Sequence, residues 1–125
     1  MQRTAVNPWP WSVPFGFNQA ELVEAPTKVL VCSGQTAIDG DGNVQHAGDI
    51  AGQVTLAYDN LEAVLAEAGM TLDDVVRITA YTTDVDGLIR SGAMLRGANK
   101  AFTLIGVSRL AYPDLLVELE AIAAT

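Results

Sequence analysis

Residues 115–123, LLVELEAIA, are an apolar run that carries two carboxylates at alternate positions. Successive side chains of a β-strand point to opposite faces, so Glu118 and Glu120 share one face and the alternate apolar side chains share the other. Glutamates inside such a strand need a partner, a cavity or solvent. This run therefore predicts a sheet with one surface that packs on a core and one surface that holds carboxylates.

The remaining segments supply the elements that pack with this strand. We expect further strands at 17–25, 28–37, 75–83 and 103–109, a short strand after the turn 39–43, and helices at 49–68 and about 86–98. The first helix has apolar residues at 4-3-4-3-4 spacing, with Asp49 as its N-cap and Gly69 just past its end. The second helix, with Asp86 as its expected cap, is weakened by its glycines.

This order of elements predicts a single α+β domain over residues 1–125. Two β-α-β passages are long enough for crossovers, which place both helices on one face of a mixed sheet. No third helix is expected to cover the other face, so the chain should oligomerise through it. Residues 1–16 are expected to form an extended arm, whose Trp9 and Trp11 pack on the chain's own surface, on a neighbouring subunit or in a ligand pocket.

Composition and charge argue against several classes of protein. Of the 125 residues, 50% are hydrophobic and 18% are charged, which is enough apolar material for a packed core. No apolar run reaches the ~20 residues of a membrane helix, and the N-terminal segment has no apolar core of signal-peptide type. We therefore expect a cytoplasmic protein with no membrane partner. The net charge of −8, with scattered Lys and Arg, argues against nucleic acid as a partner.

Metal and cofactor motifs find little support in the sequence. The run 39–50 begins with Asp-x-Asp-x-Asn, like a calcium loop, but has valine where that loop needs glycine and isoleucine where it needs glutamate. A hairpin turn is the better interpretation. His46 and Cys32 are the only residues of their types and cannot form a zinc site within one chain, and Cys32 is expected to be a small buried hydrophobe. No metal and no cofactor are expected.

The two glutamates of the apolar run leave two interpretations open. One is an ion pair, for which Arg109 on the preceding strand is the expected partner. The other is a pocket carboxylate that acts as a general acid or base. We expect one glutamate of each kind.

Six collinear motifs show a resemblance to the RidA (YjgF) family. Residues 116–123, LVELEAIA, resemble the family's LVEIEAIA, and residues 106–110, GVSRL, resemble its GVARL. VCSGQ at 31–35 resembles the family's VSGQ, and FNQA at 17–20 resembles its YSQA. NLEAVL at 60–65 resembles NLKAVL, and DDVV at 73–76 resembles DDVVK. The resemblance covers about residues 16–123, in order and at the family's spacing.

The resemblance implies a chorismate-mutase-like α+β fold, a mixed sheet with two helices on one face, assembled as a homotrimer with three clefts between subunits. The archetypal members of the family hydrolyse reactive imines and enamines, such as 2-aminoacrylate, to 2-oxo acids and ammonia. In those clefts an arginine binds the substrate carboxylate in a bidentate manner, and a glutamate orients or activates water. A Ser-Gly backbone, a tyrosine and an asparagine complete the site.

Carried over residue by residue, the resemblance implies that Glu118 is the catalytic glutamate and assigns Glu120 to structure. The implied substrate-binding positions are Phe17, Ser33, Gly34, Gly92, Phe102 and Thr103. Phe17 stands at the family's tyrosine position, Gly92 at its asparagine position and Phe102 at its arginine position. The implied cleft therefore favours small apolar or aromatic ligands over carboxylates.

Three functions stay open. The first is a divergent imine or enamine deaminase that uses Glu118 on a substrate other than 2-aminoacrylate. The second is a non-catalytic homotrimer that binds a small-molecule ligand in the same clefts. The third, from older labels of the family, is an endoribonuclease, against which the acidic charge and the lack of a basic groove argue.

Overall fold

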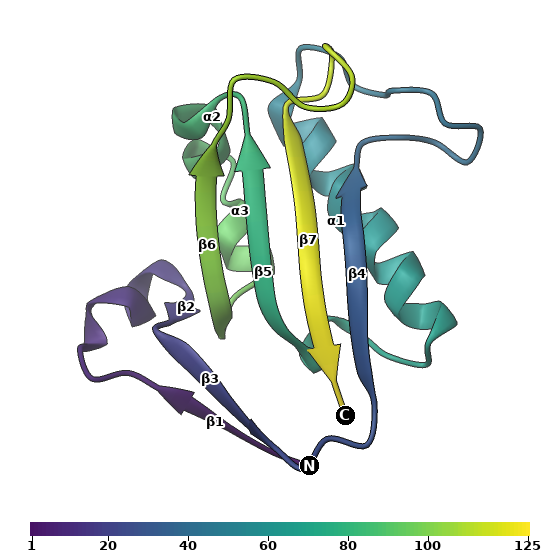
Figure 1. Ribbon diagram of the computed structural model, residues 1–125. Helices are drawn as coiled ribbons and strands as arrows, with labels where there is room; N and C mark the ends of the chain where they lie inside the picture. Colours follow the sequence, from purple (N-terminus) through teal and green to yellow (C-terminus); the bar gives the residue numbers. More distant parts are fainter.

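A five-stranded mixed sheet forms the body of the protein, with the helices packed behind one of its faces (Figure 1). The computed structural model describes residues 1–125, the side chain of Met94 excepted. The strands in spatial order are β2 (Phe17–Asn18), β6 (Lys100–Gly106), β5 (Val75–Thr82), β7 (Val117–Ala124) and β4 (Val29–Thr36). β7 runs antiparallel to β5 and β4, whereas β5, β6 and β2 are parallel. The expected α+β class and mixed sheet are confirmed.

The core lies between this sheet and helix α1 (Ile50–Glu67). The alternation predicted for the C-terminal strand is confirmed, because Val117 and Leu119 are fully buried while Glu118 and Glu120 are half-buried on the opposite face. Fully burying a side chain of this size stabilises the fold by roughly 1.5–3 kcal/mol. The apolar stripe of α1 that packs on the sheet comprises Val54, Ala57, Leu61 and Leu65, together with Tyr58.

The ends of α1 follow from local chemistry. The side chain of Asp49 accepts a hydrogen bond from the backbone N–H of Gly52 at 3.0 Å, which satisfies one of the free donors of the first turn. After the helix, Gly69 adopts a left-handed backbone with φ of 71°, a conformation that favours glycine. Both predicted ends of this helix are therefore confirmed.

The second expected helix is instead two short ones, α2 (Val85–Arg90) and α3 (Ala93–Arg96). Gly92 between them has a left-handed backbone with φ of 72°, which ends the first helix. The N-cap is Asp84, whose Oδ1 accepts from the Gly87 N–H at 3.0 Å, and not Asp86. The continuous helix at 86–98 and its predicted cap were therefore wrong, because a left-handed glycine interrupts the helical backbone.

The N-terminal segment is only partly an extended arm. Strand β1 (Gln2–Val6) pairs antiparallel with β3 (Ala20–Glu24) in a separate two-stranded sheet, and Pro10–Phe15 forms a 3-10 helix between them. The strand expected at 17–25 is divided, because β2 pairs with β6 whereas β3 pairs with β1. The N-terminal hairpin thus lies beside the lower end of the main sheet (Figure 1).

The loop between β4 and α1 contains the expected turn. Asp39 Oδ1 accepts hydrogen bonds from the backbone N–H groups of Asp41 and Asn43, at 3.0 and 2.9 Å. The expected third strand is reduced to a single antiparallel bridge between Ile38 and Val44. Within the described residues, the helices are all too short or too polar to span a membrane.

Candidate functional site

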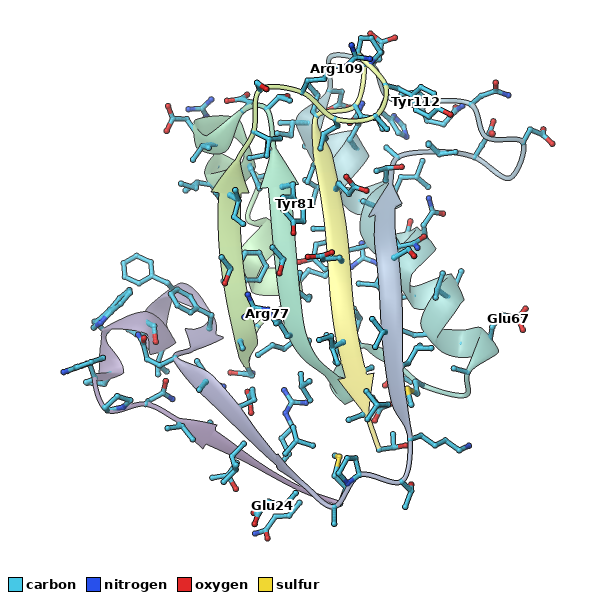
Figure 2. The ribbon with its side chains drawn as sticks, viewed as in Figure 1. Glu24, Glu67, Arg77, Tyr81, Arg109 and Tyr112 are labelled. Carbon is cyan, nitrogen blue, oxygen red and sulfur yellow. The ribbon has the colours of Figure 1, made fainter. Side chains whose placement is uncertain are left out.

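The sheet face opposite the helices is not covered by any other element of the described chain (Figures 1 and 2). Apolar side chains lie at its margins, and 74% of Val31 and 39% of Ile105 are exposed. Polar side chains from β5, β6 and β7 lie between them, namely Arg77, Thr79, Tyr81, Thr103, Glu118 and Glu120. We call this surface the open face.

Glu118 lies against Gly34 on this face. The two strands shift register between Cys32 and Gln35, so that Glu118 pairs with Thr36 and its side chain crosses the irregular part of β4. A Cβ atom built on Gly34 would lie 1.9 Å from Glu118 Oε1 and 2.6 Å from Cδ. The carboxylate therefore occupies the space that any side chain at position 34 would fill. The structure thus brings together Glu118 and Gly34, with the exposed Ser33 adjacent in the chain.

Glu120 has a tyrosine as its partner and not the expected Arg109. The hydroxyl of Tyr81 donates a hydrogen bond to Glu120 Oε1 at 2.5 Å. Among the described side chains, the ion pairs are those of Arg3 with Glu21 and of Arg96 with Asp59 and Glu62. The expected pair of Arg109 with Glu120 was wrong, because β6 ends at Gly106 and Arg109 lies in the loop beyond it, where its Nε donates to the Leu110 carbonyl (Figure 2).

Two of the expected site residues lie away from the open face. Phe102 pairs in register with the fully buried Ile78 and is itself only 9% exposed within the core, so its side chain faces the helices. Gly92 lies in the turn between α2 and α3, behind the sheet. The next residue, Thr103, turns toward the open face, where its Oγ1 accepts a hydrogen bond from Arg77 Nη2 at 3.0 Å.

Arg77 brings to this face a guanidinium that the sequence analysis did not anticipate. It lies on β5, one strand away from the position that the family alignment assigns to an arginine. In the sequence, only the alternation along the strand could have indicated that Arg77 faces this side of the sheet. The bulge between Val75 and Arg77 interrupts that alternation.

Two hollows flank the pair of glutamates. A cavity of about 150 Å³ lies between β4, β7 and β5, lined by Val31, Cys32, Arg77, Thr79, Glu120 and Ile122. Burial raises the pKa of the Cys32 thiol, which keeps this small core residue neutral. A wider groove of about 430 Å³ runs between the edge of β4 and α1, and its lining includes Gly34, Thr36, Ile38, Asn60 and Val64.

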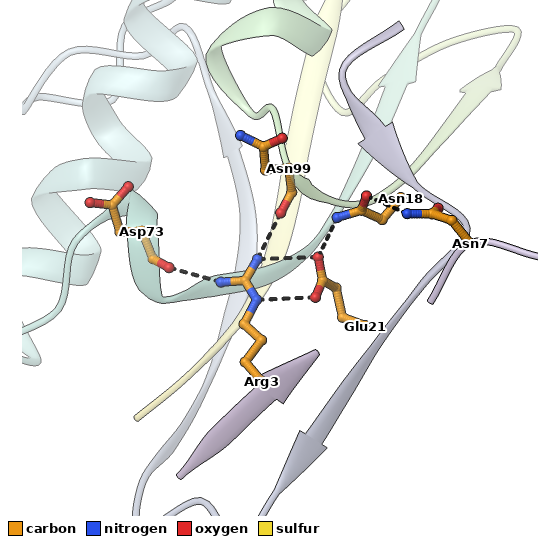
Figure 3. Close-up of polar contacts among 6 residues, drawn as sticks. All are labelled: Arg3, Asn7, Asn18, Glu21, Asp73 and Asn99. Carbon is orange, nitrogen blue, oxygen red and sulfur yellow. Dashed lines mark hydrogen bonds and ion pairs between the residues drawn. The ribbon is translucent and has the colours of Figure 1, made fainter. Parts of the chain in front are cut away.

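The guanidinium of Arg3 joins the two strands of the N-terminal hairpin and attaches the hairpin to the body of the domain (Figure 3). Arg3 Nε lies 3.2 Å from Glu21 Oε2, and its Nη1 and Nη2 donate to the carbonyls of Asp73 at 2.8 Å and Asn99 at 2.9 Å. The other oxygen of Glu21 accepts from Asn18 Nδ2 at 2.8 Å. This network fixes Asn18 and therefore the position of its neighbour in the chain, Phe17.

Phe17, a further expected site residue, also lies away from the open face, because it is in register with the buried Lys100 and packs against the core. Its ring meets that of Trp11 edge to face, with the centroids 5.7 Å apart and the planes at 82°. Trp9, Trp11 and Phe15 each remain 57–62% exposed. These aromatic side chains are therefore only partly covered by their own chain.

Across the described residues, no group of three or more His, Cys, Asp and Glu side chains is arranged to hold a metal ion. The chemical groups on the open face are two carboxylates, a phenol, a guanidinium and hydroxyls, which suit proton transfer and hydrogen bonding to a small molecule.

The chain is similar to several proteins of known sequence or structure. The family profile described as Endoribonuclease L-PSP matches residues 16–125. A RutC family protein of Pyrococcus abyssi is 37% identical over 98 residues, which are 75% of this chain and 76% of that protein. The crystal structure of YyfB, a protein of the Rid family from Yersinia pestis, is 35% identical, covers 100% of both chains and has a TM-score of 0.87. A member of the YjgF/YER057c/UK114 family from Mycobacterium tuberculosis is 32% identical, with coverage of 99% and 100% and a TM-score of 0.60.

Proposed function

The chain belongs to the RidA (YjgF) family, and on this premise we propose that it hydrolyses a small imine or enamine other than 2-aminoacrylate, in clefts between the subunits of a homotrimer. Glu118 acts as the general base that takes a proton from the attacking water. The observation that carries the proposal is the Glu118 carboxylate seated directly on Gly34, on a sheet face that the helices leave open.

The open face supports the homotrimer. Val29 and Val31 on β4 are 58% and 74% exposed, and Ile105 on β6 is 39% exposed. Apolar side chains on a flat sheet gain about 25 cal/mol for each Å² that another surface covers. Copies of the same face are the simplest cover, and their meeting would enclose Glu118 in a cleft between subunits.

The separation of the charged groups supports a substrate other than 2-aminoacrylate. Arg77 donates to Thr103, and Thr79 pairs in register with both Thr103 on β6 and Glu120 on β7. Thr103 is therefore two strands away from Glu118 and two residues further along. With strands ~4.8 Å apart and a rise of ~3.4 Å per residue, the two Cα atoms lie about 12 Å apart. The Arg77 guanidinium is thus directed toward β6, away from the strand that carries Glu118, and does not stand next to that glutamate as the family's carboxylate-binding arginine would.

Two other functions compete with hydrolysis. A protein that only binds a metabolite would use the same clefts, and this alternative is favoured by the lack of a guanidinium next to Glu118 in the described chain. Cleavage of RNA is suggested by the name of the matching family, Endoribonuclease L-PSP. It is opposed by the charge, since 15 Asp and Glu outnumber 7 Lys and Arg and would repel a polyanion.

The test uses imines formed in solution by an amino-acid oxidase from a panel of amino acids. We expect the wild-type protein to accelerate the release of ammonia, most strongly for imines with apolar side chains, and Glu118→Gln to abolish the acceleration. Light scattering should give the mass of three chains of 13.2 kDa. A folded trimer that binds 2-oxo acids but accelerates none of these reactions would support the binding protein, and cleavage of single-stranded RNA would support the nuclease.

A further inference from the structure

Tyr81 on β5 lies beside the two glutamates of β7 on the open face (Figure 2). It is the register partner of Glu118, so the two side chains project from the same surface of the sheet. Its hydroxyl reaches the next glutamate on that strand and donates to Glu120 Oε1 at 2.5 Å. The phenol oxygen is therefore bonded to the Glu120 carboxylate, and the charge of Glu118 also acts on it, although the Glu118 carboxylate itself is directed at Gly34.

This hydroxyl is not needed to hold the core together. Tyr81 is only half-buried, and its partner Glu120 lies on the same uncovered face. Tyr58 provides the contrast, because it is fully buried and its hydroxyl donates to the Ala93 carbonyl at 2.7 Å, which joins α1 to α3. Tyr58 thus has a backbone partner in the interior, whereas Tyr81 presents its oxygen to the open face.

The hydrogen bond to Glu120 also determines what the oxygen can do. It raises the pKa of Tyr81, and partial burial and the charges of Glu120 and Glu118 add to the rise, which Arg77 partly opposes. The phenol thus keeps its proton across the neutral range, and this proton is directed at Glu120. The lone pairs of the oxygen remain free to accept a hydrogen bond, and a charge-assisted bond to a carboxylate makes the oxygen a better acceptor.

We propose that Tyr81 is a further catalytic residue, whose oxygen accepts a hydrogen bond from the N–H of the substrate nitrogen while Glu120 holds the phenol in place. This inference rests on the proposed function. It names the substrate form as an iminium cation that carries an N–H group, because the nearby groups are an acceptor oxygen and two carboxylates. Glu120 is then a positioning residue rather than a purely structural one.

The reaction balances with these groups. Water attacks the carbon of the C=N bond, its proton passes to Glu118, and the π electron pair moves to nitrogen, which loses its positive charge. Glu118 then gives this proton to the nitrogen. The C–N bond breaks with its electron pair on nitrogen, and the hydroxyl proton passes to Glu118 and on to the ammonia. Iminium and water thus become a carbonyl compound and ammonium, while Tyr81 keeps its proton throughout.

The experiment compares Tyr81→Phe with a matched control, Tyr112→Phe, whose side chain is 51% exposed in the loop before β7. Loss of a hydrogen bond to a charged nitrogen should lower kcat/KM for imine hydrolysis by about tenfold or more in Tyr81→Phe, with unchanged trimer mass and melting temperature. Tyr112→Phe should retain the wild-type value. Glu120→Gln should give a smaller loss, because an amide oxygen still accepts from the phenol without the charge.

The possible failures are distinguishable. If the wild type hydrolyses imines and Tyr81→Phe stays within about twofold of it, the role of Tyr81 is overturned and the proposed function stands. A drop in melting temperature that accounts for the lost activity would assign Tyr81 to structure and overturn the role equally. If the wild type accelerates none of the imines, the proposed function fails, and the role of Tyr81 fails with it.

Discussion

Replacing Gly34 by alanine tests the position of Glu118 without altering any functional group. The added Cβ would lie 1.9 Å from Glu118 Oε1, whereas ordinary van der Waals contact begins at 3.4 Å, so the carboxylate must move by about 1.5 Å. The atoms in the way belong to the far end of a flexible side chain, and the backbone of Gly34 is not left-handed. We therefore expect a loss of stability of only about 1 kcal/mol, the low end for overpacking.

The loss of activity should be much larger than the loss of stability. A displacement of about 1 Å in a catalytic group can reduce the rate by about 100-fold, so kcat/KM for imine hydrolysis should fall by roughly this factor. Gly40→Ala is the matched control, because its Cβ would meet nothing within 4 Å, and it should keep full activity. In the Glu118→Gln background, Gly34→Ala should cause no further loss, since the group that it displaces is already inactive.

The measurements are steady-state ammonia release, light scattering and thermal melting on the three single variants and the double variant. Wild-type activity in a trimeric Gly34→Ala protein would refute the reasoning, because the reaction would then not depend on where the carboxylate lies. An equal further loss in the Glu118→Gln background would show that Gly34 acts through some other group.

Three further predictions concern the contacts that hold the site. Gln53→Leu should lower the free energy of unfolding by about 2–4 kcal/mol, because the buried amide of Gln53 donates to the Asp114 carbonyl and accepts from the Leu116 N–H, both at 2.7 Å. Chemical denaturation measures this, and a loss under about 0.5 kcal/mol would contradict it. Arg3→Ala should lower the free energy of unfolding by about 3 kcal/mol, since it leaves the buried carboxylate of Glu21 without its cation. It should also speed amide hydrogen exchange in β1, and unchanged exchange would show that the hairpin is held by other contacts. Glu120→Gln should lower the pKa of Tyr81, since the hydrogen bond to Glu120 is the largest cause of its rise, and the phenol should then ionise at lower pH. Ultraviolet titration, with Tyr81→Phe as the reference, measures this directly, and an unmoved transition would mean that Glu120 does not control the phenol.

The features that could be read from the sequence are those that depend on near neighbours. Asp49 and Gly69 mark the ends of α1 because a cap contacts groups only three or four residues away. The alternation of Val117 and Leu119 with Glu118 and Glu120 follows from strand geometry alone. The family resemblance also needed only the order of short motifs, and the profile match over residues 16–125 confirms it.

The second helix shows where local reasoning fails even at short range. Its apolar and polar residues fit a continuous helix from about 86 to 98, and its glycines only weaken such a helix. The chain instead ends α2 at Arg90 and places Gly92 in the left-handed region before α3. Whether a glycine inside a helix is tolerated or ends the helix depends on packing. Here Tyr58 of α1 holds α3 in place, because its hydroxyl donates a hydrogen bond to the Ala93 carbonyl.

Only the tertiary structure decides which face each strand residue occupies and which distant groups meet. A shift of one residue moves every side chain of a strand to the other face, so the motif alignment could not show that Phe102 enters the core while Thr103 faces Arg77. Tyr81 and Glu120 are 39 residues apart in the chain, and Arg3 reaches the Asp73 and Asn99 carbonyls across 70 and 96 residues. Such contacts arise from strand register and the packing of the hairpin, which no local pattern encodes. The sequence alone therefore indicated the family and the face shared by Glu118 and Glu120, whereas the fold decided that Glu118 lies against Gly34 and that Glu120 accepts from Tyr81.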